Sequence, residues 1–181
     1  MSPPGGGRDG SDLLDGRIGE AWAGEVPNGS HVNLVIGRRG SPTAAAATAA
    51  LASPSPGHTP FLACLSAGTV VRPATVVVNK ATITGSTLGP MTFGAAQLGI
   101  AQGVLDAVAE GLLDPAEAAE LVLLVALWVD PVADDERGLK SANRAAMRGA
   151  IADAVQPADA GAVRALADRR ESAANAYYTG G

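Results

Sequence analysis

The segment that runs from Gly29 to Pro42 reads GSHVNLVIGRRGSP and has the pattern of a β-strand followed by a tight turn and the start of a helix. Apolar side chains alternate with others along it, which predicts a strand with one face against a core. Gly37 and Gly40 allow the backbone to reverse after the strand. Ser41 then suits a helix N-cap, and the proline that follows suits the first helical position. The apolar face carries Val32, Leu34 and Ile36, and the opposite face carries His31, Asn33 and Val35.

The polar face of this strand is the best candidate site that periodicity alone identifies. Histidine ordinarily titrates at about pH 6.5, so it can give or take a proton near neutrality. His31 lies next to the amide of Asn33 and ahead of a glycine-rich turn. A lone histidine on a strand is more often a structural residue than a catalyst. The pattern therefore leaves two interpretations open, an acid–base enzyme and a protein that binds a small ligand.

The composition indicates a globular protein without a nucleic-acid surface. A chain of 181 residues has the length of one domain with a substantial core. Hydrophobic residues make up 47% and aromatic residues only 3%, so alanine, valine and leucine must fill that core by close packing. The net charge of -5 is opposite to that of most nucleic-acid-binding surfaces.

We expect a cytoplasmic protein with no membrane partner. The longest apolar run, Leu121 to Val129, is shorter than the roughly 18 residues that span a bilayer. The first ten residues lack the apolar segment of a secretory signal. The single Cys64 cannot form an internal disulfide, which fits a reducing compartment. One cysteine and two distant histidines do not have the spacing of metal ligands, so we predict no metal.

The pattern of elements predicts an α+β fold, a two-layer sandwich of helices on a sheet. We expect a disordered tail over residues 1–17, one domain over 18–156, and a C-terminal helix or tail over 157–181. Strands are expected at 17–22, 31–36, 61–65, 75–83 and 121–129, and helices at 43–51, 91–110, a short stretch from 115, and 134–155.

A second pair of polar side chains accompanies the first. In the strand expected over 75–83, alternation places Lys80 and Thr82 on one face, as His31 and Asn33 share a face in theirs. A lysine on a strand is most often solvated. Its alternative role is to hold a polar or anionic ligand against the sheet.

A series of short motifs stands in a fixed order along the chain. They are Gly19-Glu20-Ala21, His31-x-x-Leu34-x-Ile36-Gly37-x-Arg39-Gly40-Ser41-Pro42, Leu62-Ala63, Asn79-Lys80-x-Thr82-Ile83, Phe93-Gly94-x-Ala96-Gln97-x-Gly99, Gln102, Asp106-Ala107-Val108-Ala109-Glu110-Gly111 and Pro115-Ala116-x-Ala118. Individually the motifs are weak, but their order and spacing are specific. Together they resemble the formaldehyde-activating enzyme family over about residues 18–155.

The resemblance implies a carbon–nitrogen hydro-lyase of one-carbon metabolism. That family condenses formaldehyde with tetrahydromethanopterin to methylene-tetrahydromethanopterin and water, which detoxifies formaldehyde. The resemblance also implies a fold like the second domain of ribosomal protein S5. It further implies a homo-oligomer, a pentamer, with active sites between subunits. The pterin is a co-substrate, and no permanently bound cofactor is implied. The family's general-acid histidine falls on His31, and its pterin-contacting residues fall on Asn33, Leu62, Lys80, Thr82 and Gln97.

The chain departs from the family pattern at several positions. Asn33 stands where the family usually has aspartate, and it keeps the shape of that residue without its charge. Ala95 replaces a usual proline and Leu98 a histidine. Such departures are typical of a divergent paralogue. The alternative function is therefore a non-catalytic protein that binds formaldehyde or a pterin on the same scaffold.

Overall fold

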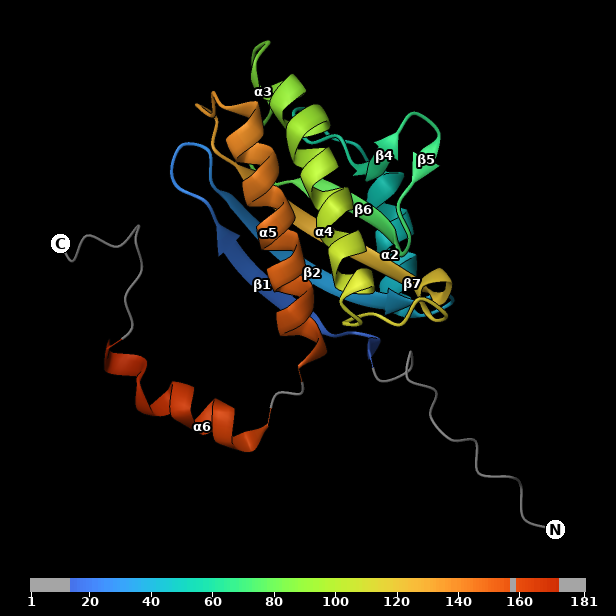
Figure 1. Ribbon diagram of the computed structural model, residues 1–181, viewed down its shortest axis with the longest axis vertical. Coiled ribbons are helices and arrows are strands. Elements are labelled where there is room, and N and C mark those ends of the chain that lie inside the picture. The colour runs from blue at the N-terminus through green and yellow to red at the C-terminus, as the bar shows by residue number, and fades with distance from the viewer. Residues whose placement is uncertain (1–13, 157–158, 173–181) are drawn as a thin grey trace.

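A five-stranded mixed sheet forms the centre of the computed structural model, which describes residues 14–156 and 159–172 (Figure 1). β6 and β7 are parallel, and the other neighbouring strands are antiparallel. The predicted α+β class is confirmed, and the strand expected at 121–129 lies in the middle of the sheet. The strands are, in spatial order, β1 (Ile18–Ala23), β2 (Ser30–Arg38), β7 (Leu121–Val129), β6 (Ala74–Asn79) and β3 (Phe61–Leu62).

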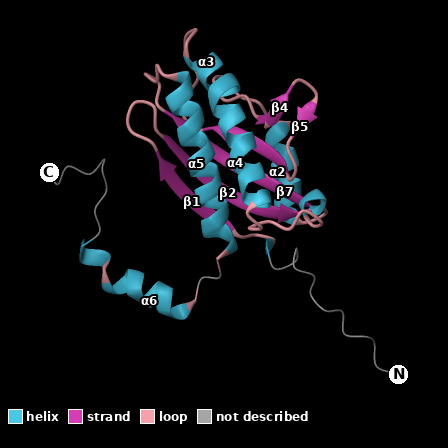
Figure 2. Cartoon of the chain, in the orientation of Figure 1, coloured by secondary structure: helices cyan, strands magenta, loops and turns pink. Residues whose placement is uncertain are grey.

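Two long helices cover one face of the sheet, α4 (Gln97–Ala109) and α5 (Glu136–Val155) (Figure 2). The apolar faces of β2 and β7 point toward them and are fully buried. Gly99 and Gly103 let α4 lie very close to α5, since a Cβ at Gly99 would overlap the backbone oxygen of Lys140. The expected close packing of small side chains is thus seen where the two helices meet.

The helix α2 (Pro42–Leu51) packs on the opposite face of the sheet, at the end where β2 finishes. Gly37 makes this approach feasible, because a Cβ there would come within 2.9 Å of the Ala44 backbone nitrogen. The Ser41 hydroxyl accepts a hydrogen bond from the Ala44 N–H at 3.2 Å, so the predicted cap is confirmed. The sheet therefore carries helices on both faces at this end, where the sequence predicted a single helical layer.

The middle of the chain is more irregular than predicted. The strand expected over 75–83 ends at Asn79, whose side-chain amide donates to the Gly57 oxygen at 2.7 Å and the Ala81 oxygen at 2.6 Å and so folds the chain back. The strand expected at 61–65 is divided into β3 and β4 (Cys64–Ser66), and β4 pairs with β5 (Thr69–Val70).

The helix expected at 91–110 consists of three parts, α3 (Leu88–Pro90), a π-helix η1 (Met91–Ala96), and α4. The expected helix near residue 115 is a turn followed by one 3₁₀ turn, η2 (Ala118–Glu120), which leads directly into β7. A continuous apolar run such as that of β7 is typical of a strand buried on both faces. Instead, the side chains of β7 alternate between buried and half-buried, because α2 covers only part of its second face.

Both ends of the described chain extend past the central domain. Residues 14–17 fell in the expected tail, yet the Gly16 N–H donates to the Ile36 oxygen at 2.8 Å, so these residues are attached to β2. Residues 1–13 of that tail lie outside the described residues. Within 157–181 the chain forms α6 (Ala160–Asp168), which has no buried side chain, and η3 (Arg170–Ser172). In the described parts of the chain, every helix is too short or too polar to cross a bilayer.

Candidate active site

The candidate site lies on what we call the open face, the sheet face opposite α4 and α5 at the end away from α2. Cross-strand neighbours share a face of a sheet, so the register fixes its members. His31 is paired with Trp22 of β1 and with Trp128 of β7. Asn33 is paired with Glu20 of β1. Strand pairing thus places Glu20, Trp22 and Trp128 beside His31 and Asn33. Of these five residues, only the last two were predicted from the sequence as site residues.

A chain of hydrogen bonds joins four side chains on the open face. Glu20 Oε1 lies 2.7 Å from His31 Nε2, and Lys80 Nζ lies 3.0 Å from His31 Nδ1. The same Lys80 nitrogen donates to Asn33 Oδ1 at 2.8 Å. Lys80 comes just after β6, and its backbone N–H continues the strand pairing by donating to the Leu127 oxygen at 2.6 Å. The structure therefore brings His31, Asn33 and Lys80 into direct contact.

These partners select the tautomer of a neutral His31. A carboxylate only accepts hydrogen bonds, so the nitrogen that faces Glu20, Nε2, carries the proton. Nδ1 then has its lone pair toward the Lys80 amine, which donates. Protonation of Nδ1 places an N–H against that amine, and Lys80 can then accept only as a neutral amine. His31 and Lys80 thus form a pair between which one proton can pass.

Lys80 has an environment that favours its neutral form more than water does. Its side chain is exposed at the rim of the open face, yet partial burial of the ammonium lowers the pKa of Lys80 below its ordinary value. The Glu20 carboxylate acts in the opposite direction and raises that pKa, but it is the smaller influence. The amine is therefore a better nucleophile near neutral pH than a fully solvated lysine.

Two tryptophans form an aromatic wall beside His31. The Trp22 ring centre lies 6.2 Å from that of His31 and 5.5 Å from that of Trp128. Trp22 donates its indole N–H to the Gly24 oxygen at 3.0 Å, which holds the ring, and 41% of the residue is exposed. A flat, partly exposed aromatic surface next to polar groups is suited to a planar heterocycle.

The other three residues predicted from the sequence lie farther from His31. Leu62 of β3 is on the same sheet face, paired with Val76 of β6, and two strands, β7 and β6, separate it from β2. Thr82 is in the loop after β6, with its hydroxyl 3.2 Å from His58 Nε2. Gln97 begins α4, which covers the opposite face of the sheet. Within one chain, Gln97 is therefore not brought to His31.

His58 lies in a loop rich in proline and glycine, yet it is half-buried and both of its ring nitrogens are hydrogen-bonded. Its Nδ1 lies 2.8 Å from the Asn79 backbone oxygen, so this ring nitrogen is the donor and Nε2 is left to accept from Thr82. The histidine thereby ties the loop before β3 to the loop that carries Lys80 and Thr82. A histidine in a loop rich in proline and glycine gave no signal of this contact.

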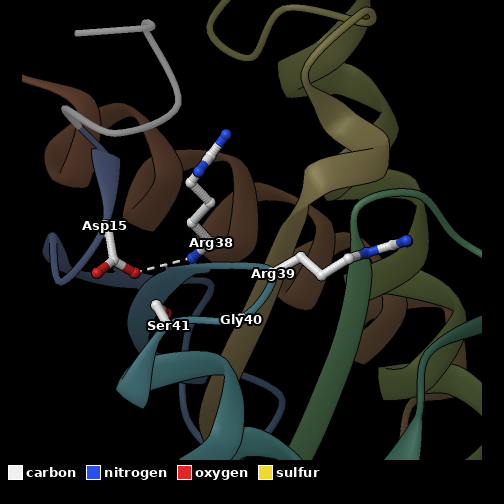
Figure 3. A pocket seen from close by; sticks show the side chains of 5 residues that line it. All are labelled: Asp15, Arg38, Arg39, Gly40 and Ser41. Atoms are coloured by element: carbon white, nitrogen blue, oxygen red, sulfur yellow. Dashed lines mark hydrogen bonds between the residues drawn. The ribbon is translucent and has the colours of Figure 1, made fainter. Parts of the chain in front are cut away.

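A separate cavity of about 340 Å³ lies at the turn between β2 and α2 (Figure 3). Its carboxylate, Asp15, accepts from the Arg38 backbone N–H at 2.8 Å. The Arg39 side chain extends away from that carboxylate, and its Nη2 donates to the Ala119 oxygen at 3.1 Å. The cavity is lined by Asp15, Arg38, Arg39, Gly40 and Ser41, at the opposite end of β2 from His31.

Across residues 14–156 and 159–172, no group of three or more histidine, cysteine or acidic side chains could hold a metal ion.

Comparison with known proteins identifies the family. Residues 18–177 match the family model described as formaldehyde-activating enzyme. The chain is 37% identical over 145 residues to 5,6,7,8-tetrahydromethanopterin hydro-lyase of Methanosarcina barkeri, a match that covers 80% of this chain and 82% of that protein.

Two bifunctional Fae/Hps enzymes are also similar. The identity is 37% over 143 residues for that of Archaeoglobus fulgidus and 34% over 139 residues for that of Methanothrix thermoacetophila, covering 79% and 77% of this chain. The chain corresponds to only 36% of each of these longer proteins. From the family match and these identities, the chain belongs to the formaldehyde-activating enzyme family.

Proposed function

We propose that the protein condenses formaldehyde with tetrahydromethanopterin to methylene-tetrahydromethanopterin and water, with His31 as the general acid. The observation that carries this proposal is the position of the His31 ring, between Glu20 at 2.7 Å and Lys80 at 3.0 Å on a face that solvent reaches. The name of the Methanosarcina barkeri relative describes a lyase that acts on this pterin and involves water, which supports the choice of reaction.

The chemistry requires a proton donor that works near neutral pH. An amine of the reduced pterin adds to formaldehyde and forms a carbinolamine, whose hydroxyl is a poor leaving group. Protonation lets it depart as water, and the second pterin amine then attacks the resulting iminium carbon. A positioned histidine contributes roughly 10²–10⁴-fold to such a step. Glu20 assists, because its carboxylate accepts a hydrogen bond from Nε2 and so holds the His31 ring in place.

The pterin is proposed to contact Asn33, Leu62, Lys80, Thr82 and Gln97. The Trp22 and Trp128 rings suit the flat bicyclic part of such a ligand, and Lys80 and Asn33 offer polar groups at its edge. Gln97 lies on the far side of the sheet from His31 in the same chain, so a neighbouring subunit is the source from which it could reach the site. This supports a homo-oligomer, a pentamer in our proposal, with sites between subunits. The S5-like fold and the cytoplasmic location stay predictions.

The test is a stopped-flow measurement of methylene-tetrahydromethanopterin formation, corrected for the spontaneous reaction. We expect His31→Ala to lower the catalysed rate by roughly 10²–10⁴-fold, because it removes the proton donor. Lys140→Arg on α5 is the control and should react like the wild type. Wild-type protein that binds the pterin in calorimetry without accelerating the condensation would favour the non-catalytic alternative.

A further inference from the structure

We propose that Lys80 is a nucleophile that takes up formaldehyde covalently and passes its carbon on to an amine of the reduced pterin. The proposal rests on the proposed function, because it takes formaldehyde as the electrophile. It adds a role for this side chain that a contact with the pterin does not include. Three features support it, namely the hydrogen bonds of the nitrogen, its accessibility, and an acid within reach.

The hydrogen-bond partners of Lys80 are those that a neutral amine needs in order to react. A neutral amine has two N–H groups and one lone pair. Asn33 Oδ1 at 2.8 Å and His31 Nδ1 at 3.0 Å each accept one N–H, which leaves the lone pair without a competing hydrogen. The side chain is exposed, so a molecule as small as formaldehyde can reach the nitrogen.

Partial burial of the nitrogen also favours the neutral amine, and it outweighs the opposing charge of the Glu20 carboxylate. The titratable groups that face it are His31 from β2 and Glu20 from β1, and Asn33 contributes a neutral amide oxygen. Burial lowers the pKa of Lys80 more than Glu20 raises it. An aspartate in place of Asn33 would put a second carboxylate at hydrogen-bond distance and hold the ammonium form.

The first half of the reaction forms an iminium on the lysine. The Nζ lone pair bonds to the formaldehyde carbon while the carbonyl π pair moves to oxygen. One N–H proton leaves the nitrogen for His31 Nδ1, and the oxygen takes up one proton from the solvent, which gives the carbinolamine Lys–NH–CH₂OH. The imidazolium of His31 then protonates the hydroxyl, which departs as water, and the nitrogen lone pair forms the double bond of Lys–NH⁺=CH₂.

The second half transfers the carbon without oxidation or reduction. A pterin amine bonds to the iminium carbon, a proton moves to the Lys80 nitrogen, and the bond between that nitrogen and the carbon breaks. The lysine amine is restored and the carbon becomes an iminium on the pterin. Attack by the second pterin amine closes the ring and returns one proton to the solvent. The sum is formaldehyde plus the diamine giving the methylene adduct and water.

The chain carries its own control, since it has two lysines, Lys80 and Lys140 of α5. The folded protein is treated at neutral pH with limiting formaldehyde and sodium cyanoborohydride, with no pterin present. Hydride reduces a lysine iminium to N-methyl-lysine, which adds one CH₂ unit. Peptide mass spectrometry then gives the rate at each lysine. We expect Lys80 to be methylated several-fold faster than Lys140, and equal rates would overturn the proposal.

Two variants separate a reactive amine from a merely exposed one. Asn33→Asp is nearly isosteric and should slow methylation of Lys80 while Lys140 is unchanged. Lys80→Arg keeps a charged donor next to His31 but cannot form the iminium, so it should lose the condensation activity. Circular dichroism and the oligomeric state establish that each variant is folded. A Lys80→Arg protein with the wild-type condensation rate would show that the lysine is only a contact.

The order of addition tests the transfer and separates the two proposals. Tetrahydromethanopterin added before the reductant should reduce trapping at Lys80, because the pterin consumes the iminium, and should leave Lys140 unaffected. Wild-type catalysis without preferential methylation of Lys80 would reject the covalent route and keep the proposed function. Preferential methylation without catalysis would keep the Lys80 adduct and reject the condensation.

Discussion

Replacement of Glu20 by glutamine removes one charge from the candidate site with little change of shape. Glu20→Gln still offers His31 Nε2 an oxygen acceptor in place of the carboxylate that now lies 2.7 Å away. What it loses is the negative charge on the acceptor of that hydrogen bond. If His31 gives its proton to the leaving hydroxyl, this variant should have a lower kcat for the condensation.

The magnitude follows from the kind of hydrogen bond and its exposure. A hydrogen bond to a charged group contributes about 1.5–3 kcal/mol and one between neutral groups about 0.5–1.5 kcal/mol, a difference of about 1 kcal/mol. The side chains of His31 and Glu20 are 33% and 56% exposed, so screening by water keeps the loss of hydrogen-bond energy at about 1 kcal/mol and no larger. A barrier raised by about 1 kcal/mol corresponds to about a fivefold loss of kcat.

The assay is the initial rate of methylene-tetrahydromethanopterin formation at saturating pterin, corrected for the spontaneous reaction. Because Glu20 contacts His31, we expect a lower kcat with little change in KM. Glu120→Gln is the matched control, since it removes an exposed carboxylate at the other end of the sheet, near Arg39. A Glu20→Gln enzyme with the wild-type kcat, or one as impaired as His31→Ala, would refute this account of the carboxylate.

Two further predictions concern the packing of α4 on α5. Gly99→Ala gains about 1 kcal/mol of helix propensity but forces a Cβ onto the Lys140 backbone oxygen, an overpacking that costs about 1–3 kcal/mol or more, so urea unfolding should show a net loss of stability. Gly94→Ala, whose Cβ would meet nothing within 4 Å, should be neutral or stabilising, and equal effects of the two would contradict the packing argument. The Arg144 guanidinium hydrogen-bonds Asp106 and holds the pKa of that carboxyl below its ordinary value. This stabilisation is present above the ordinary carboxyl pKa and is lost as pH falls through the lowered one, so the difference in unfolding free energy between wild type and Asp106→Asn should shrink on acidification; a difference that stays constant with pH would count against the ion pair.

The local pattern of the chain was sufficient for several elements. Alternation over 31–36 defines the buried and open faces of β2 because side chains on a strand project to opposite sides in turn. Ser41 and Pro42 define the start of α2, and the apolar run at 121–129 defines the central strand. The order of the motifs was sufficient for the family. In each case the signal lies within a few consecutive residues or in their spacing.

The composition of the site depended on contacts between distant segments. Register between strands decided that Glu20, Trp22 and Trp128 lie beside His31, and no spacing along the chain encodes that register. Lys80 could be placed on the correct face by alternation, but its hydrogen bonds to His31 and Asn33 depend on the parallel pairing of β6 with β7. Gln97 lies on the other side of the sheet because the glycines of α4 hold that helix against α5.

The sequence by itself determined which side chains share a face of one strand, since that follows from backbone geometry. Only the tertiary structure decided which strands and helices lie side by side, since burial of apolar surface selects that arrangement for the chain as a whole.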